Sequence, residues 1–202
     1  MEKFFNQLAK PAKLVYVIGA FLYALLFAIL TAAGIGGTFM SVTTNLIILI
    51  VGTALLVAAP IFILLDKNEP AKVVFLILLG YFVLSNILNY FGLAEARVVK
   101  DADGGVIAQG IFDFLLGLAL ASILVLIALE FMFKKPIFRF VAFFIMLGII
   151  LVALVTFIIA LVNCIRFEAG WTGYLNIIML YLLPAPVLFF GYLYFFGAPA
   201  KK

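Results

Sequence analysis

Asp113 is the ionisable residue placed deepest within a long apolar stretch of this chain of 202 residues. A charged side chain at the centre of a membrane helix costs roughly 2.5–3.5 kcal/mol, and such a residue is therefore a functional-site hypothesis. Asp113 follows Val106 by seven residues, or about 10 Å along a helix axis, so its depth is intermediate. It shares a helical face with Gln109 and Gly117.

Amide side chains occur at comparable depth in neighbouring apolar stretches. Asn86 should lie level with Asp113, Asn89 lies one turn nearer the outer surface, and Asn163 falls in the outer half of a later stretch. A carboxylate and several amides can bind a small solute through charge and hydrogen bonds. We therefore predict an outward-facing polar pocket formed by Asp113, Asn86, Asn89, Gln109 and Asn163.

The same polar residues also fit a purely structural network. Asp113 would then pair with Arg97 or Arg166, and the asparagines would cross-link helices through hydrogen bonds. Glu130 has a simpler interpretation, because it precedes Lys134 by four residues. This spacing predicts an ion pair on one helix face near the end of the helix.

Enzymatic chemistry is not expected. The chain has no histidine and one cysteine, which excludes Ser/His and Cys/His nucleophiles and the usual histidine-bearing zinc sites. Asp113 has no second deep carboxylate with which to form an aspartate pair, and no glycine-rich phosphate loop follows a strand. We predict no metal and no cofactor.

The composition places these residues in a membrane. The chain is 68% hydrophobic and 11% charged, with a mean hydropathy of +1.37, whereas soluble domains are about half apolar and a quarter charged. The apolar surplus must face the lipid bilayer. A net charge of +4 does not indicate a nucleic-acid partner, because the lysines and arginines lie at the ends of apolar stretches.

Six apolar stretches are long enough to cross a bilayer as helices, since about 20 residues are required. They are too long and too uniform in polarity for the strands of a barrel. We predict an all-α, polytopic protein with one domain, 1–202, in which three helical hairpins follow one another. The predicted helices cover residues 14–34, 45–66, 71–92, 106–133, 137–165 and 173–196.

Proline and lysine recur where the first, third and fifth of these helices begin. Pro11-Ala12-Lys13 and Pro70-Ala71-Lys72 open two of them, and Lys135-Pro136 opens the third. This pattern suits a repeat of hairpins. Alternatively, these residues only mark where helices begin and indicate no repeat, because proline is tolerated in the first turn of a helix.

Basic residues set the predicted orientation. Ten of the 13 lysines and arginines lie on the side that holds both termini, and three lie on the other. The positive-inside rule therefore predicts a cell (cytoplasmic) membrane location with both termini in the cytoplasm. The first helix is interpreted as retained rather than as a signal peptide, because more spans follow. Residues 1–10 are expected to lie at the membrane surface.

Small residues indicate which helix faces lie inside the bundle. In membranes, helices pack closely through small side chains, and alanines four apart form such a face in the first helix: Ala20, Ala24, Ala28 and Ala32. A comparable stripe contains Ala153, Thr156, Ala160 and Asn163. General bundle packing explains these patterns equally well.

Prolines within two predicted helices indicate breaks. Pro60 should interrupt the helix over 45–66, while Pro184 and Pro186 should interrupt the last helix near its middle. Several transporters place binding sites at such breaks. The alternative is a static kink that improves packing.

The arrangement resembles the substrate-binding S subunits of energy-coupling-factor vitamin transporters. The residues that carry the resemblance are Ala20-Phe21-Leu22-Tyr23-Ala24, with the ladder extended through Ala28 and Ala32. The resemblance implies six helices, an outward-side pocket, and docking of the first helix on a coupling subunit.

These observations favour a small-solute transporter, or a membrane component of one, with a small-molecule ligand. The alternative is a non-catalytic subunit or scaffold of a larger complex, which would bind a membrane-protein partner through its first helix. The direction of the Asp113 face distinguishes the two. An inward face favours transport, and a lipid-facing one favours a partner.

Overall fold

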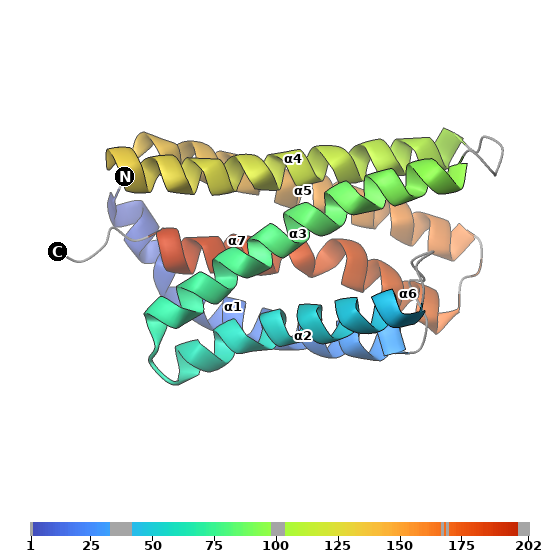
Figure 1. Ribbon diagram of the computed structural model, residues 1–202, viewed down its shortest axis with the longest axis horizontal. Helices are drawn as coiled ribbons and strands as arrows, with labels where there is room; N and C mark the ends of the chain where they lie inside the picture. The colour runs from blue at the N-terminus through green and yellow to red at the C-terminus, as the bar shows by residue number, and fades with distance from the viewer. Residues whose placement is uncertain (1, 33–41, 98–103, 167, 169, 198–202) are drawn as a thin grey trace. The chain divides into compact units, whose positions relative to one another are not determined.

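The computed structural model describes residues 2–32, 42–97, 104–166, 168 and 170–197 (Figure 1). These residues form helices joined by short turns, and no strand occurs among them. The all-α prediction is therefore confirmed for this part of the chain. The elements are α1 (Glu2–Ala32), α2 (Val42–Leu64), α3 (Asn68–Arg97), α4 (Gly104–Phe133), α5 (Ile137–Arg166), α6 (Trp171–Ile177), the π-helical segment η1 (Ile178–Leu182) and α7 (Pro184–Phe196).

Four helices are long and apolar enough to cross a membrane, as judged within the described residues. The qualifying stretches are Pro11–Ile29, Asn68–Ile87, Phe114–Phe133 and Ile137–Arg166. Apolar stretches in α2 and α7 are shorter, at Ile50–Leu64 and Pro184–Phe196. The helices mark the chain as an integral membrane protein, whereas the count of six spans stays a prediction.

The first helix begins earlier than its apolar stretch. α1 runs from Glu2 to Ala32 with Pro11 inside it, so residues 2–10 continue the same helix. A proline removes one backbone N–H donor, but the hydrogen bonds on either side of it can hold the helix together.

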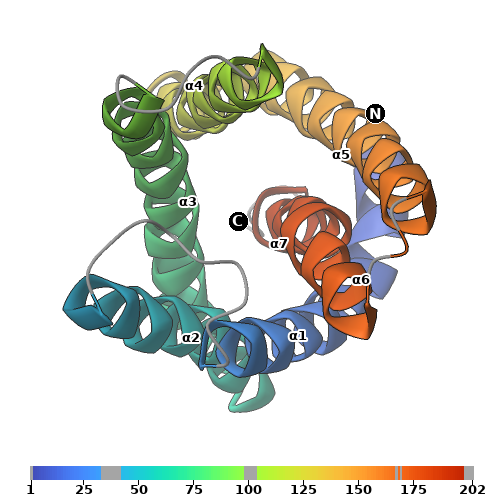
Figure 2. The same ribbon diagram turned by 90° about the vertical axis from the view of Figure 1, so that its right-hand side faces the viewer.

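The contacts divide the chain into two compact units. Unit 1 comprises Met1–Phe75 and Leu147–Lys202, and unit 2 comprises Leu76–Met146. In unit 1, α1 packs against α2 and against α7, as both views show (Figures 1 and 2).

The face of α1 that packs inside unit 1 repeats every four residues. Ala12, Tyr16 and Ala20 are fully buried, and Ala24 is 3% exposed. Residues four apart lie on one helix face, and alanine lets another backbone approach closely. α7 is buried on most of its circumference, at Ala185, Val187, Leu188, Phe189, Gly191, Tyr192, Leu193 and Phe196.

Aromatic rings join α1, the start of α3 and α7 within unit 1. The Phe75 ring centroid lies 5.7 Å from that of Tyr16 and 5.2 Å from that of Phe195. Gly191 makes this approach feasible, because a Cβ atom there would lie 2.3 Å from Cε2 of Phe75. Any side chain at position 191 would therefore have to displace the Phe75 ring.

Polar contacts hold the end of α7 to the start of α3. The Tyr194 hydroxyl donates a hydrogen bond of 2.7 Å to Oδ1 of Asn68. The Lys72 ammonium lies 4.8 Å from the centroid of the Phe196 ring, within the range of a cation–π interaction.

Unit 2 contains a part-buried ion pair between α4 and α5. Arg139 binds Glu130 through its Nη2 atom, and the two side chains are 18% and 15% exposed. The predicted pairing of Glu130 with Lys134 is wrong. Lys134 has a φ of 53° and lies beyond the end of α4, so it no longer follows the helical spacing that would place it beside Glu130.

Candidate functional site

The Asp113-bearing stripe of α4 faces α3 at Gly117. Gly117 is buried, and a Cβ atom on it would lie 3.1 Å from Cγ1 of Ile87 and 3.3 Å from Cβ of Asn86. The two helices therefore approach closely at the beginning of the polar part of α3. Asp113 lies four residues before Gly117, which places it on the same stripe, one turn along α4.

Asn86 is half-buried at this crossing and bonds within its own helix. Its Nδ2 donates a 2.7 Å hydrogen bond to the Phe82 carbonyl, to which the Ser85 hydroxyl also donates at 3.1 Å. One donor of the Asn86 amide is thus satisfied locally. This contact supports the structural interpretation of Asn86 as well as a binding role, since its carbonyl oxygen can still accept a hydrogen bond.

The side chains of Asn89, Gln109 and Asp113 lie outside the described residues, although their backbones are helical. Their helical positions can still be compared. Asn89 is three residues beyond Asn86 on α3, and Asp113 is one turn from Gly117 on α4. In an antiparallel hairpin that crosses at Asn86 and Gly117, both positions lie toward the same end.

Asn163 does not lie on an inward face. Its side chain is exposed, whereas those of Ala153, Thr156 and Ala160 on the same stripe are half-buried. The side chains of this stripe are therefore half-buried as far as Ala160 and exposed at Asn163, which lies three residues before the end of α5 at Arg166. The place of Asn163 in the predicted outward-facing polar pocket stays a prediction.

The alanine ladder of α1 lies partly in the core. Ala20 and Ala24 are buried and Ala28 is half-buried, while the side chain of Ala32 lies outside the described residues. A partner that approached α1 would therefore contact its other face. That face carries the exposed apolar side chains Leu14, Ile18, Leu22, Leu25 and Ile29.

The two predicted proline breaks have different outcomes. α2 continues through Pro60, which is buried, so the predicted interruption there is wrong. A single missing N–H is tolerated when the flanking turns keep their own hydrogen bonds.

The last helix is interrupted at Pro184. The chain passes from α6 through the π-helical η1 and a bend at Leu183 before α7 begins at Pro184. The Leu183 N–H donates to the Ile178 carbonyl at 3.1 Å, five residues back. This longer spacing is that of a π-bulge, a feature often found at functional sites.

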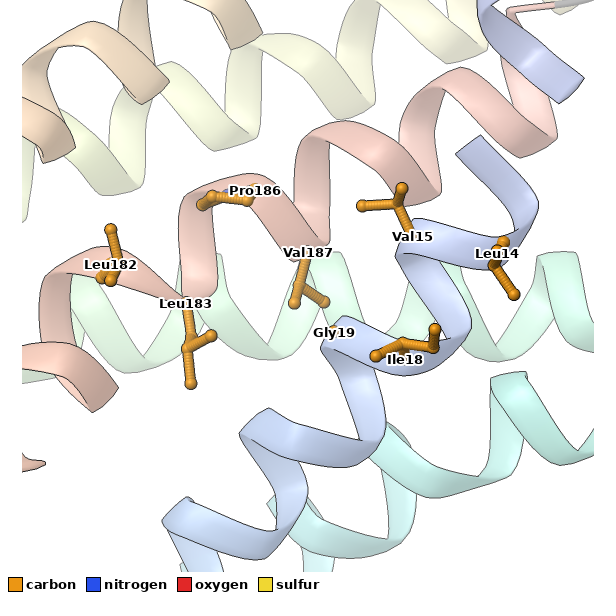
Figure 3. A pocket seen from close by; sticks show the side chains of 8 residues that line it. All are labelled: Leu14, Val15, Ile18, Gly19, Leu182, Leu183, Pro186 and Val187. Atoms are coloured by element: carbon orange, nitrogen blue, oxygen red, sulfur yellow. The ribbon is translucent and has the colours of Figure 1, made fainter. Parts of the chain in front are cut away.

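A groove of about 410 Å³ lies beside this break in unit 1 (Figure 3). One wall consists of Leu14, Val15, Ile18 and Gly19 from α1. The other consists of Leu182, Leu183, Pro186 and Val187 from η1, the bend and α7. All the lining residues are apolar. The sequence pointed only to Pro186, as a helix-breaking residue, and not to the apolar residues that line the groove with it.

The hydroxyl of Tyr16 is buried in unit 1 without a hydrogen-bond partner among the described residues. An unsatisfied buried polar group costs about 1–3 kcal/mol. We therefore expect Tyr16→Phe to keep or raise the melting temperature of the purified protein. Tyr194→Phe is the matched control, because it removes the bond to Asn68 and should lower stability by about 0.5–1.5 kcal/mol. A loss with Tyr16→Phe would show that its hydroxyl has a partner.

The described residues contain no group of three or more histidine, cysteine, aspartate or glutamate side chains that could hold a metal ion. Glu130 and Arg139 form an ion pair next to the connection between α4 and α5. Within the part of the chain that the structure describes, the α3–α4 hairpin at Asn86 and Gly117 and the apolar groove at Pro186 are the candidate ligand sites.

Comparison with known proteins adds no relative from which a role could be transferred. A functional assignment must therefore rest on the hairpin and the groove. No protein-family model, curated protein or solved structure matches this chain.

Proposed function

We propose that the chain is a small-solute transporter, or a membrane component of one, that binds its solute at the α3–α4 hairpin. The observation that carries the proposal is the close approach of Gly117 to Asn86 and Ile87. It supports the proposal because Gly117, which shares a stripe of α4 with Asp113, faces α3 rather than lipid. A carboxylate on an interhelical face in a membrane is a functional-site hypothesis by default.

The residue types at this hairpin indicate the class of solute. Asp113 contributes a carboxylate, and Asn86, Asn89 and Gln109 contribute amides. A carboxylate accepts hydrogen bonds only, and an amide both donates and accepts them. The site is therefore suited to a small solute with amino or hydroxyl groups, bound from the predicted outer side.

Water access to the hairpin provides a direct test. In a Cys164→Ser background, Gln109→Cys and Leu115→Cys are labelled in intact cells with a charged, membrane-impermeant thiol reagent. Leu115 is the matched control, because it lies on α4 and is 57% exposed, on a face suited to lipid. We expect labelling of Gln109→Cys and none of Leu115→Cys. Lack of reaction at Gln109→Cys would contradict a solvated site.

Binding is tested by mass spectrometry of small molecules that co-purify in mild detergent. We expect a bound molecule to be lost from Asp113→Asn, while the variant keeps its elution profile and melting temperature. If Asp113→Asn instead unfolds the protein and no molecule is found with the original chain, Asp113 is a structural residue.

A second candidate function is a non-catalytic subunit of a larger membrane complex. The exposed Asn163 favours it, because an amide on the surface of a membrane helix can bind a partner helix. A coupling subunit and ATPases would be the partners if the likeness to vitamin-transporter S subunits reflects function. A partner that co-purifies with the original chain and Asp113→Asn, but not with Asn163→Leu, would favour this candidate.

A further inference from the structure

The turn between α4 and α5 places two lysines at the ends of two apolar helices (Figure 1). α4 ends at Phe133 and α5 begins at Ile137, and both helices are apolar enough to cross a membrane up to these residues. Lys134 and Lys135 lie between them, and both side chains are exposed. A turn between two such helices lies where the hydrocarbon of a bilayer meets its headgroups.

The acid nearest in sequence does not neutralise these lysines. Glu130 is bound by Arg139 from the start of α5, and both of these side chains are part-buried. Within the part of the chain that the structure describes, neither Lys134 nor Lys135 forms an ion pair. Their ammonium groups are therefore available to an anion from outside the protein.

Lys134 occupies a backbone position at which glycine is the usual residue. Its φ is 53°, and its N–H donates to the Glu130 carbonyl at 2.8 Å, so α4 ends in a left-handed residue. Glycine is preferred there because a Cβ atom is strained in this conformation. The positive charge of Lys134 is thus present at a cost in stability, and strain of this kind supports a hypothesis of function.

Large apolar side chains flank the two lysines. Phe131, Phe133 and Ile137 are 85%, 57% and 58% exposed, and such side chains are more stable beside acyl chains than in water. The turn therefore presents apolar surface next to positive charge. An anionic phospholipid has the complementary combination of acyl chains and a negatively charged phosphate.

The turn between α2 and α3 has a different charge balance. Lys67 is exposed there, but Asp66 and Glu69 beside it are exposed as well. Carboxylates next to the ammonium group offset its attraction for an anion. This turn therefore lacks the positive excess of the α4–α5 turn, and it provides a matched comparison.

We propose that the α4–α5 turn binds the headgroup of an anionic phospholipid. Lys134 and Lys135 attract its phosphate, while Phe131 and Phe133 contact its acyl chains. This site lies at the end of the helices that carries the lysines, and the proposal does not rest on the solute site proposed for the α3–α4 hairpin.

Native mass spectrometry of the delipidated full chain tests this proposal. The probes are phosphatidylglycerol, which is anionic, and phosphatidylcholine, which is zwitterionic, with the same acyl chains. We expect phosphatidylglycerol to bind more tightly. Lys134→Gln and Lys135→Gln should each weaken its binding by about fivefold and leave phosphatidylcholine binding unchanged. Lys67→Gln is the control and should bind phosphatidylglycerol as the original chain does.

Lys134→Gly separates loss of charge from loss of folding. Glycine adopts a positive φ without strain, so this variant should melt at a higher temperature in detergent and still lose as much phosphatidylglycerol binding as Lys134→Gln. Unchanged binding by Lys134→Gly would overturn the proposal.

Three further outcomes would also overturn it. Equal losses with Lys67→Gln and Lys134→Gln would mean that anionic lipid is attracted to lysines at any turn. Displacement of phosphatidylglycerol by inorganic phosphate would indicate a phosphate site that does not require a lipid. A co-purifying protein that is lost from Lys134→Gln, while phosphatidylglycerol binding is unchanged, would show that the turn binds a protein partner.

Discussion

Replacing Gly191 with alanine is expected to destabilise the protein by about 1–3 kcal/mol, the usual penalty for overpacking a core. The added Cβ would lie 2.3 Å from Cε2 of Phe75 and 2.9 Å from Cε2 of Tyr16. Both rings are fully buried, so neither can rotate into lipid. Alanine gains about 1 kcal/mol over glycine in helix propensity, which reduces the loss but does not remove it. Thermal unfolding in detergent, followed by size-exclusion chromatography, measures the effect.

Gly80→Ala is the control for this experiment. Gly80 is also helical, but nothing lies within 4 Å of a Cβ placed on it, so the substitution should be neutral or stabilising. Phe75→Leu combined with Gly191→Ala should recover part of the loss, because the smaller side chain leaves room. If Gly191→Ala is as stable as Gly80→Ala, α7 does not pack against Phe75 as described.

Removing Arg139 alone is expected to have a second large effect. Exposed ion pairs contribute about 0–1 kcal/mol, whereas breaking a buried pair costs about 3–5 kcal/mol because one charge is left unpaired. The side chains of Glu130 and Arg139 are 15% and 18% exposed, so this ion pair resembles a buried pair more than an exposed one. We therefore expect Arg139→Leu to lower the free energy of unfolding by roughly 2–4 kcal/mol, measured by chemical denaturation in mixed micelles.

A double substitution distinguishes the effect of breaking the ion pair from the effect of losing the packing of the Arg139 side chain. Glu130→Leu combined with Arg139→Leu should be more stable than Arg139→Leu alone, because no charge then remains in a part-buried site. Lys134→Leu should have little effect, since Lys134 is exposed beyond the end of α4. A loss with Lys134→Leu as large as that with Arg139→Leu would contradict the assignment of Arg139 as the partner.

Properties that depend on composition and on local spacing were predictable from the sequence. The apolar stretches predicted α3, α4 and α5 to within a few residues, except that α3 continues to Arg97. A backbone in hydrocarbon has to satisfy its own hydrogen bonds, so a long apolar stretch permits little besides a helix. The break at Pro184 was predictable for a related reason, because two prolines two residues apart remove two backbone N–H donors within one helical turn.

Proline alone did not predict the outcome at Pro60. The sequence interpretation placed a break at both sites, yet α2 continues through Pro60. A lone missing donor leaves most of the helical ladder intact, and the surrounding packing then decides whether the helix continues. Pro60 is buried beside the fully buried Ala59, in a well-packed part of the helix.

The candidate site was predictable in part. The stripe through Asp113 and Gly117 was recognisable from residues four apart, but the approach of Gly117 to Asn86 required the crossing of α4 over α3. The exposure of Asn163 had no signal in the sequence, because an asparagine at the end of an apolar helix has the same local pattern whether it faces protein or lipid. In a membrane, both surroundings accept the same apolar neighbours.

The sequence by itself determined that this chain is helical, that it belongs in a membrane, and where its last helix breaks, because these properties follow from hydropathy and backbone donors within one segment. Only the tertiary structure decided which residues meet. Arg139 rather than Lys134 pairs with Glu130, Gly191 is bounded by Phe75, and a groove opens between Ile18 and Pro186. Each of these contacts joins residues from different helices, and their relative rotation and spacing depend on packing between surfaces of nearly uniform polarity.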